Sequence, residues 1–319
     1  MTTAPGLAGH ELIKGNGTRN DFLLLVDPER EVAVSPDDVA AVCDRHGGFG
    51  ADGFVRVVRT AALPGAEAFA AAVPEAEWFM DYYNADGSVA EMCGNASRLF
   101  AAVLDAEGLR PTADGDSLTI GTRGGARTIT RIGDLWTVDM GPARLARPEG
   151  AEADVDTEGW DTMVDVPGLD GPRAALSIEM PNPHTVVALA DEDELDAALF
   201  AGLTDSDAPG YEPRPPEGTN LELVVPLGEE VDEGTGERIG VARMRVLERG
   251  VGETLSCGTG CCAVAVALHE WVGPQAPTSY RLLVPGGEIG VHVGADPWAD
   301  GTTVLLTGPA EVTGRVTVS

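Results

Sequence analysis

The feature that most constrains this chain is an internal repeat. The segment NADGSVAEMCGNASRLFAAVL (84–104) resembles ERGVGETLSCGTGCCAVAVAL (248–268) when Cys93 is aligned with Cys257. Each copy has a polar, glycine-containing stretch, then Cys-Gly-(Asn/Thr), then small and apolar residues at helical spacing. Two halves built alike predict a pseudo-symmetric molecule, with one cysteine at a helix N-terminus in each half and a cleft between the halves.

Strand-like and helical segments alternate around both copies. In the first half we expect strands at 22–26, 54–58 and 78–84, a helix from the Ser-Pro-Asp-Asp cap at 35–38 to about 47, and a helix ending at Gly108. Three antiparallel strands then follow. In the second half we expect strands at 173–180, 184–190, 220–226 and 241–248, a helix at 191–202 and a helix after Cys257. The stretches 146–172 and 204–218 are expected to be loops.

Composition narrows the class of partner. The 319 residues carry 21 Lys+Arg against 52 Asp+Glu, a formal net charge of −31. Such a surface repels phosphate backbones and anionic lipid, so neither nucleic acid nor a membrane surface is an expected partner. Five cysteines do not form a disulfide framework, and no signal-peptide or membrane-spanning pattern is visible. The sequence predicts a cytoplasmic protein that acts on a small molecule and keeps its thiols reduced.

A cysteine at a helix start meets the positive end of the helix dipole and unpaired backbone N–H groups, which favour the thiolate. If one of the two cysteines is a thiolate and the other a thiol, the first can remove a proton from a tetrahedral carbon. The second can then deliver a proton to the opposite face and invert the centre. The backbone N–H groups near Gly94-Asn95 and Gly258-Thr259 could hold a carboxylate and stabilise the developing negative charge.

No cofactor or metal is expected. Amino-acid racemases commonly use pyridoxal phosphate on a lysine, but Lys14 is the only lysine and is expected in a glycine-rich N-terminal loop. No nucleotide-binding glycine motif follows a strand. The five histidines are scattered, and Cys257, Cys261 and Cys262 lack partners at zinc spacing. We read Cys43, Cys261 and Cys262 as core residues.

At these motifs the chain resembles the diaminopimelate epimerase family, in its actinobacterial form, over essentially its whole length. The resemblance lies in Arg19-Asn20-Asp21-Phe22, Asn84-Ala85-Asp86-Gly87-Ser88, Met92-Cys93-Gly94-Asn95, Asn182-Pro183-His184, Asn220, Glu248-Arg249-Gly250 and Gly252-Glu253-Thr254 before Cys257-Gly258-Thr259-Gly260. Asn16, Ala96, Pro181 and Thr219 depart from the family pattern, which leaves a different amino-acid substrate open.

The resemblance implies a fold and a reaction. The fold is α/β (α+β), with two pseudo-symmetric domains, each a curved, mostly antiparallel sheet around a central helix. Residues 1–139 plus 309–319 would form the half that carries Cys93, and 140–308 the half that carries Cys257. The implied activity is pyridoxal-phosphate-independent interconversion of LL- and meso-diaminopimelate, in an enzyme that is often a homodimer.

The resemblance also implies roles for particular residues. The acid/base pair would be Cys93 and Cys257, with His184 and Glu248 beside them. The substrate would be held by Asn20, Asn84, Gly94, Asn95, Asn182, Asn220, Glu248, Arg249, Gly258 and Thr259. Asparagines offer both donor and acceptor groups, and an arginine can grip a carboxylate with two hydrogen bonds.

Three other interpretations stay open at this point. A cofactor-independent racemase for a proline- or histidine-type substrate is disfavoured by Asn95 and Arg249. A thiol–disulfide redox protein is disfavoured because there is no C-x-x-C motif. Each proposed site residue could also be structural: the asparagines as turn residues, His184 as a strand cap, and Glu248 with Arg249 as a surface charge pair.

Overall fold

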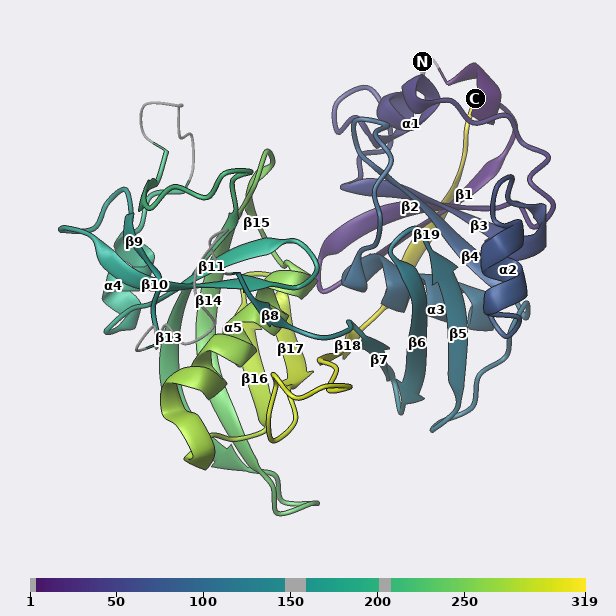
Figure 1. Cartoon of the computed structure of the whole chain (residues 1–319). Coiled ribbons are helices and arrows are strands. Elements are labelled where there is room, and N and C mark those ends of the chain that lie inside the picture. Colours follow the sequence, from purple (N-terminus) through teal and green to yellow (C-terminus); the bar gives the residue numbers. More distant parts are fainter. Residues whose placement is uncertain (1–3, 147–158, 201–207) are drawn as a thin grey trace. The chain divides into compact units, whose positions relative to one another are not determined.

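Contacts between Cα atoms divide the chain into two units, which the computed structural model in Figure 1 shows with their elements labelled. Unit 1 contains residues 1–139 and 307–319, and unit 2 contains residues 140–306. The structure describes residues 4–146, 159–200 and 208–319.

Unit 1 is built on a curved sheet that contains both antiparallel and parallel pairings. Going outward from β1, the pair β1–β2 is antiparallel, β2–β3 parallel, β3–β4 antiparallel, β4–β5 parallel, and β5–β6 and β6–β7 antiparallel. The C-terminal strand β19 pairs with the other edge of β1. The strands are β1 (Glu11–Gly17), β2 (Asn20–Val26), β3 (Gly53–Arg59), β4 (Trp78–Asn84), β5 (Ser117–Thr122), β6 (Gly125–Ile132), β7 (Leu135–Asp139) and β19 (Glu311–Thr317), with β18 (Leu305–Pro309) beside β7 at the unit boundary.

The helix that follows Cys93 is the centre of unit 1. This helix, α3 (Gly94–Ala106), contacts β1, β2, β3, β6, β7 and β19, and every residue from Gly94 to Ala101 is buried. Most of the buried residues of α3 are small or apolar, as a helix enclosed by its own sheet requires, but Asn95, Ser97 and Arg98 are buried polar residues. The start of α3 is therefore held from several directions by the surrounding strands.

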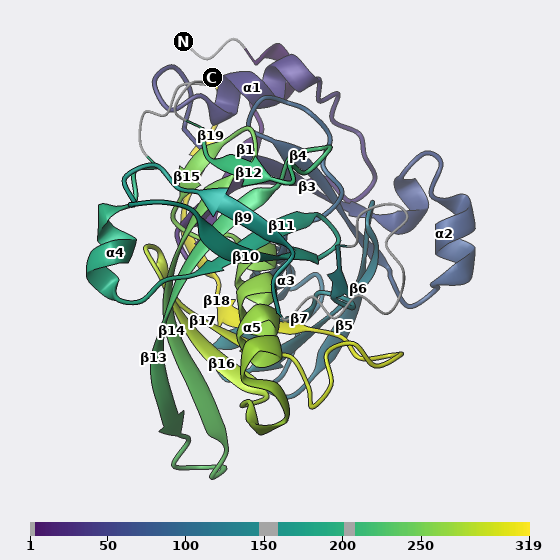
Figure 2. The same cartoon turned by 60° about the vertical axis from the view of Figure 1, so that its left-hand side comes forward.

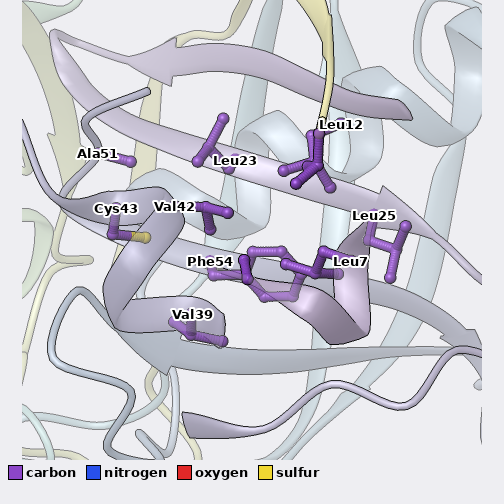
Figure 3. Close-up of a cluster of buried hydrophobic side chains, with 11 residues drawn as sticks. Leu7, Leu12, Leu23, Leu25, Val39, Val42, Cys43, Ala51 and Phe54 are labelled. Atoms are coloured by element: carbon purple, nitrogen blue, oxygen red, sulfur yellow. The ribbon is translucent and has the colours of Figure 1, made fainter. Parts of the chain in front are cut away.

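A second helix, α1 (Pro36–Cys43), covers a separate apolar cluster (Figure 3). Its start is a capping box: the Ser35 hydroxyl accepts from the Asp38 backbone N–H, and the Asp38 carboxylate accepts from the Ser35 N–H. Beneath it, Figure 3 labels Leu7, Leu12, Leu23, Leu25, Val39, Val42, Cys43, Ala51 and Phe54, all of them buried. Unit 1 also has α2 (Glu67–Ala72) and two 3-10 turns, Pro5–Leu7 and Thr60–Ala62.

Unit 2 repeats the pairing pattern of unit 1. The pair β10–β11 is antiparallel, β11–β13 parallel, β13–β14 antiparallel, β14–β16 parallel and β16–β17 antiparallel. The strands are β8 (Arg144–Leu145), β9 (Thr162–Asp165), β10 (Arg173–Glu179), β11 (Pro183–Ala188), β12 (Gly210–Glu212), β13 (Asn220–Val231), β14 (Arg238–Glu248), β15 (Gly252–Thr254), β16 (Ser279–Val284) and β17 (Gly287–His292). The repeat seen in the sequence is thus also a repeat of sheet topology.

The counterpart of α3 in unit 2 is α5 (Gly258–Val272), which Figure 2 shows against the strands of its unit. It contacts β10, β11, β13, β16 and β17, and its residues Gly260–His269 are buried. Cys261 and Cys262 are fully buried on this helix, and Cys43 is buried as the last residue of α1, so their prediction as core residues is confirmed. A shorter helix, α4 (Glu192–Ala197), and a 3-10 turn, Gly273–Gln275, complete the unit.

Several local predictions were wrong. Lys14 lies in β1 and not in a loop, because residues 11–17 pair with two strands. The helix expected at 191–202 ends at Ala197, where the chain turns so that Leu199 N–H donates to Pro167 O; residues 201 and 202 lie outside the described residues. The expected loops contain β9 and β12, short strands that pair with each other and, through β9, with β10. Residues 147–158 and 204–207 of those stretches lie outside the described residues.

Candidate active site

Cys93 occupies the N-cap position of α3, with extended backbone angles of φ −143° and ψ 122°. Its Sγ donates to Asn20 Oδ1 at 3.8 Å, and the same oxygen accepts from Asn95 Nδ2 at 3.1 Å. Asn95 is 1% exposed, while Cys93 is half-buried. Three of the predicted residues from unit 1 therefore come together, although Asn20 lies 73 positions before the cysteine.

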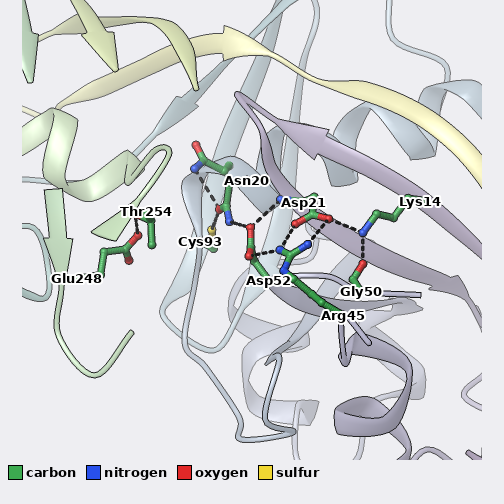
Figure 4. Close-up of polar contacts among 10 residues, drawn as sticks. Lys14, Asn20, Asp21, Arg45, Gly50, Asp52, Cys93, Glu248 and Thr254 are labelled. Atoms are coloured by element: carbon green, nitrogen blue, oxygen red, sulfur yellow. Dashed lines mark hydrogen bonds and ion pairs between the residues drawn. The ribbon is translucent and has the colours of Figure 1, made fainter. Parts of the chain in front are cut away.

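A charged cluster supports Asn20 from behind (Figure 4). Asn20 Nδ2 donates to Asp52 Oδ2 at 2.7 Å, and Asp52 Oδ1 accepts from Arg45 Nη2 at 2.6 Å. Arg45 also pairs with Asp21, whose carboxylate accepts from Lys14 Nζ. Lys14, which the sequence singled out as the one candidate for a Schiff base, is thus engaged with Asp21 and with the Gly50 carbonyl (Figure 4).

Asn84 and Gly94 complete the predicted set in unit 1. Asn84 ends β4, and its Nδ2 donates to Ser88 Oγ at 2.9 Å within the turn that leads toward Cys93. Its exposed side chain is therefore part of a turn in this structure. Gly94 is the first, buried residue of α3, next to the cysteine.

Cys257 is the N-cap of α5, in the same extended conformation as Cys93, with φ −119° and ψ 114°. Its Sγ lies 3.5 Å from Thr259 Oγ1, and Gly258 starts the helix. Burial raises the pKa of the Cys257 thiol well above 9.0, and the negative charges of Glu248 and Glu222 raise it further, while Thr259 and the Gly260 N–H oppose the shift. The surroundings of Cys257 therefore favour the protonated thiol.

His184 is fixed by a carboxylate that the sequence analysis did not single out. His184 Nδ1 lies 2.6 Å from Glu222 Oε1, and His184 Nε2 lies 3.0 Å from Asn182 Oδ1. Both the His184 and Glu222 side chains are fully buried. The parallel register that pairs His184 with Asn220 places Glu222, two residues further along β13, on the same face of the sheet. No sequence motif marks Glu222; only the strand register does.

Glu248 and Asn220 hold the loop that precedes Cys257. Thr254 Oγ1 donates to Glu248 Oε1 (Figure 4), and Asn220 Oδ1 accepts from the Arg249 backbone N–H at 2.9 Å. Burial raises the pKa of Glu248, and the Glu222 charge adds to the rise, although Thr254 and the neighbouring His184 and Cys257 oppose it. The Arg249 guanidinium is exposed and donates from Nη1 to the Glu217 carbonyl at 2.6 Å.

Each unit therefore carries one cysteine at the start of its buried helix, with its own polar residues around it. In unit 1 these include Asn20 and Asn95; in unit 2 they include His184, Glu222 and Glu248. Among the residues that the structure describes, no group of three or more His, Cys, Asp or Glu is placed to hold a metal ion. In those same ranges no two cysteines form a disulfide, and no helix has the length and apolar character needed to cross a membrane.

Solved structures share this mixed α/β fold. One is a phenazine biosynthesis protein of the PhzF family from Bacillus anthracis, with a TM-score of 0.64 and 13% identity over 96% of this chain and 98% of that chain. Another is a hydroxyproline epimerase from Agrobacterium vitis, with a TM-score of 0.58 and 14% identity over 97% of this chain and 92% of that one. These likenesses define the fold class, and the predicted fold class is confirmed.

Sequence comparison identifies the family within that class. The family model for diaminopimelate epimerase matches residues 12–146 and 176–313. The diaminopimelate epimerase of Streptomyces coelicolor is 43% identical over 94% of this chain and 92% of its own length. That of Rhodococcus erythropolis is 38% identical over 98% of this chain and 97% of its own length. The chain belongs to the diaminopimelate epimerase family, as its motifs predicted.

Proposed function

We propose that this chain is an isomerase that interconverts LL- and meso-diaminopimelate by two-base proton transfer at the α carbon. The observation that carries the proposal is the repeated unit, in which the same sequence of sheet pairings precedes a buried helix whose N-cap is a cysteine. The similarity to proteins named diaminopimelate epimerase supports the choice of substrate.

The proposed chemistry needs one sulfur on each face of the α carbon. A thiolate removes the α proton, the electron pair stays on carbon as a carbanion-like transition state, and the opposite thiol returns a proton to the other face. Backbone N–H groups at Gly94-Asn95 and Gly258-Thr259 hold the α-carboxylate and stabilise the charge that develops beside it. The reverse reaction uses the same groups with their roles exchanged.

The surroundings of Cys257 support its role as the proton donor in one direction of the reaction. Its raised pKa favours the protonated thiol, and the raised pKa of Glu248 makes this neighbouring carboxyl a better proton acceptor than an ordinary glutamate. His184, fixed by Glu222, places a second titratable group in the same cluster. We assign Glu248 and His184 to the exchange of the Cys257 proton between turnovers.

The remaining predicted residues are assigned to substrate binding. Diaminopimelate has two amino-acid ends, so the end that does not react must be recognised by polar side chains. Arg249 is exposed, as a group that grips an incoming carboxylate must be. We assign this role to Asn20, Asn84, Asn182, Asn220 and Arg249. A homodimer and a cytoplasmic location, where both thiols stay reduced, remain part of the proposal.

Solvent-deuterium NMR tests the function directly. The purified protein, with no pyridoxal phosphate added, is expected to introduce deuterium at the α position of LL-diaminopimelate and to form the meso isomer. Exchange of proline or histidine, without exchange of diaminopimelate, would replace the proposed substrate by that of a related racemase. No exchange with any of the three amino acids would overturn the proposal.

Substitution of each cysteine tests the two-base assignment. Cys93→Ala and Cys257→Ala should each abolish epimerisation while the circular dichroism spectrum stays that of the parent. Cys43→Ala is the matched control, because it also removes one thiol but from the apolar cluster under α1, and it should keep the activity. Epimerisation by either single active-site variant would exclude a mechanism that needs both thiols.

A further inference from the structure

A buried arginine lies one turn into α3, behind Cys93. Arg98 is fully buried. Its Nη2 donates to Asn95 Oδ1 at 2.5 Å, and its Nη1 donates to the Pro309 carbonyl at 2.7 Å. Both terminal nitrogens also donate to Thr18 Oγ1 at 3.2 Å. This one side chain therefore connects α3, the β1–β2 turn and the end of β18.

The hydrogen bonds from Arg98 run in one direction. A guanidinium only donates, so Asn95 Oδ1 must face Arg98 and Asn95 Nδ2 must point away from it. Asn95 Nδ2 donates to Asn20 Oδ1 at 3.1 Å, and Asn20 Nδ2 donates to Asp52 Oδ2 at 2.7 Å. A carboxylate only accepts, so Arg98 at one end of this series of hydrogen bonds and Asp52 at the other fix the orientation of both asparagine amides. The oxygen of Asn20, and not its nitrogen, is thereby directed at Cys93 Sγ.

The same arginine holds a strained turn. Thr18 and Arg19 join β1 to β2 with φ values of 54° and 61°, the left-handed region that side chains other than glycine rarely adopt. Such residues persist only where the surroundings hold them, and Thr18 is 3% exposed with both Arg98 nitrogens on its hydroxyl. The next residue is Asn20, so the conformation of this turn determines the backbone position from which the Asn20 side-chain amide extends.

Close backbone approach makes room for this arrangement. A Cβ on Gly308 would overlap Arg98 Nη1, and a Cβ on Gly17 would lie 2.7 Å from the Asn95 carbonyl oxygen. Neither contact is sterically possible, so both glycines are needed where they stand. Two separate segments of the chain are thus shaped to admit Arg98 and the start of α3.

We propose that Arg98 is a positioning residue for Cys93: it holds the Thr18 turn and the Asn95 amide so that Asn20 Oδ1 accepts the Cys93 S–H. The inference rests on the proposed function, because it orients the Cys93 thiol as the proton donor in the direction of the reaction in which Cys257 is the base. An acceptor on the S–H stabilises the thiol over the thiolate. The charged groups around this series of hydrogen bonds are Arg98 on α3 and Asp52 before β3, with Arg45, Asp21 and Lys14 behind them.

Arg98→Lys tests the proposal, because it keeps the charge but loses the fork of donors. In a Cys257→Ser background, alkylation of Cys93 by iodoacetamide near neutral pH is followed by mass spectrometry. With the Asn20 oxygen no longer held, we expect Cys93 to be alkylated about threefold faster or more, the change that about half a pH unit in thiol pKa produces. In the chain with both cysteines, kcat for diaminopimelate should fall about tenfold or more.

Arg56→Lys is the matched control. Arg56 is 1% exposed in the same unit and donates to the Val32 carbonyl, with Asp27 and Asp81 nearby. It should lower the thermal midpoint as Arg98→Lys does but change neither Cys93 alkylation nor kcat more than about twofold. An unchanged alkylation rate in folded Arg98→Lys, or an equal increase in Arg56→Lys, would overturn the proposal.

A second pair of variants covers the case in which Arg98→Lys does not fold. Thr18→Val keeps the shape of the side chain but removes the hydroxyl that accepts from Arg98, whereas Thr18→Ser keeps the hydroxyl. Thr18→Val should accelerate Cys93 alkylation and Thr18→Ser should not; equal rates would contradict the assignment. Alkylation needs no amino-acid substrate, so this outcome is read separately from failure of the protein to epimerise diaminopimelate.

Discussion

Gly260 lies in the first turn of α5, where a methyl group would meet the carboxylate that holds His184. A Cβ built there would lie 2.7 Å from Glu222 Oε1 and 3.3 Å from Cys257 Cβ. Intrinsic helix propensity alone says that Gly260→Ala stabilises the helix by up to about 1 kcal/mol. The close contacts at Gly260 predict instead that the substitution destabilises the protein, and the sizes of the two effects can be compared.

The steric effect is the larger of the two. Ordinary contact begins near 3.4 Å, so the Glu222 carboxylate at 2.7 Å would have to move by about 0.7 Å. Glu222 is fully buried and bonded to His184 at 2.6 Å, so that movement breaks or strains a charge-assisted hydrogen bond. Loss of such a bond costs about 1.5–3 kcal/mol, and overpacking a core costs a similar amount. After the gain in helix propensity, we expect Gly260→Ala to destabilise unit 2 by about 1–2 kcal/mol.

A double-mutant cycle isolates the contact. Urea unfolding gives the free-energy change of Gly260→Ala in the parent chain and in a Glu222→Ala background, and hydrogen exchange of α5 assigns the change to unit 2. Truncation of Glu222 removes the obstructing oxygen, so in that background Gly260→Ala should be neutral or stabilising by up to about 1 kcal/mol. The reasoning is refuted if Gly260→Ala stabilises the parent chain, or if its cost is the same in both backgrounds.

Three further outcomes are expected. Ser35→Ala removes the cap of α1 and should lower the free energy of unfolding, measured in urea, by about 1 kcal/mol. An unchanged free energy of unfolding would show that the capping box does not stabilise the protein. Burial alone would raise the pKa of Asp38, but hydrogen bonds from Ser35 lower it below its ordinary value of 3.8, so its stabilising contribution is present above that pH and is lost as the pH falls through the lower folded value. Accordingly, Asp38→Asn should lose stability at neutral pH, and its unfolding free energy should fall less than that of the parent when the pH is lowered toward 3; parallel pH curves would contradict this. Apart from burial, the negative charge of Glu248 is the leading cause of the raised pKa of the Cys257 thiol, so Glu248→Gln should speed its alkylation near neutral pH in a Cys93→Ser background, and a slower reaction would reverse the assigned sign.

Much of the local structure could be read from short stretches of sequence. The helices α3 and α5 begin directly after Cys93 and Cys257, as their Cys-Gly spacing predicted. The Ser-Pro-Asp-Asp signal correctly marked the start of α1, because capping depends on residues three positions apart. The short strands β9 and β12 were missed, since a strand of three or four residues is stabilised by its neighbours more than by its own composition.

The sequence alone could not predict which residues surround the candidate site residues. In the sequence, Glu222 is an ordinary acidic residue in an apolar strand. Only the register of β11 and β13 places it against His184. In the sequence, Arg98 is one basic residue in a helix. Only the tertiary structure shows that it donates to the Thr18 hydroxyl and to the Pro309 carbonyl. In both cases the partners lie far away along the chain.

By itself, the sequence determined that this chain consists of two similar halves, each with a cysteine at the start of a buried helix, and that it belongs with the diaminopimelate epimerases. These features are set by periodicity, caps and motifs, which act within a few residues. Only the tertiary structure decided which carboxylate fixes His184, which arginine orients the amides beside Cys93, and which glycine must lack a side chain. Those choices depend on strand register and on the packing of distant segments, and no local pattern encodes either.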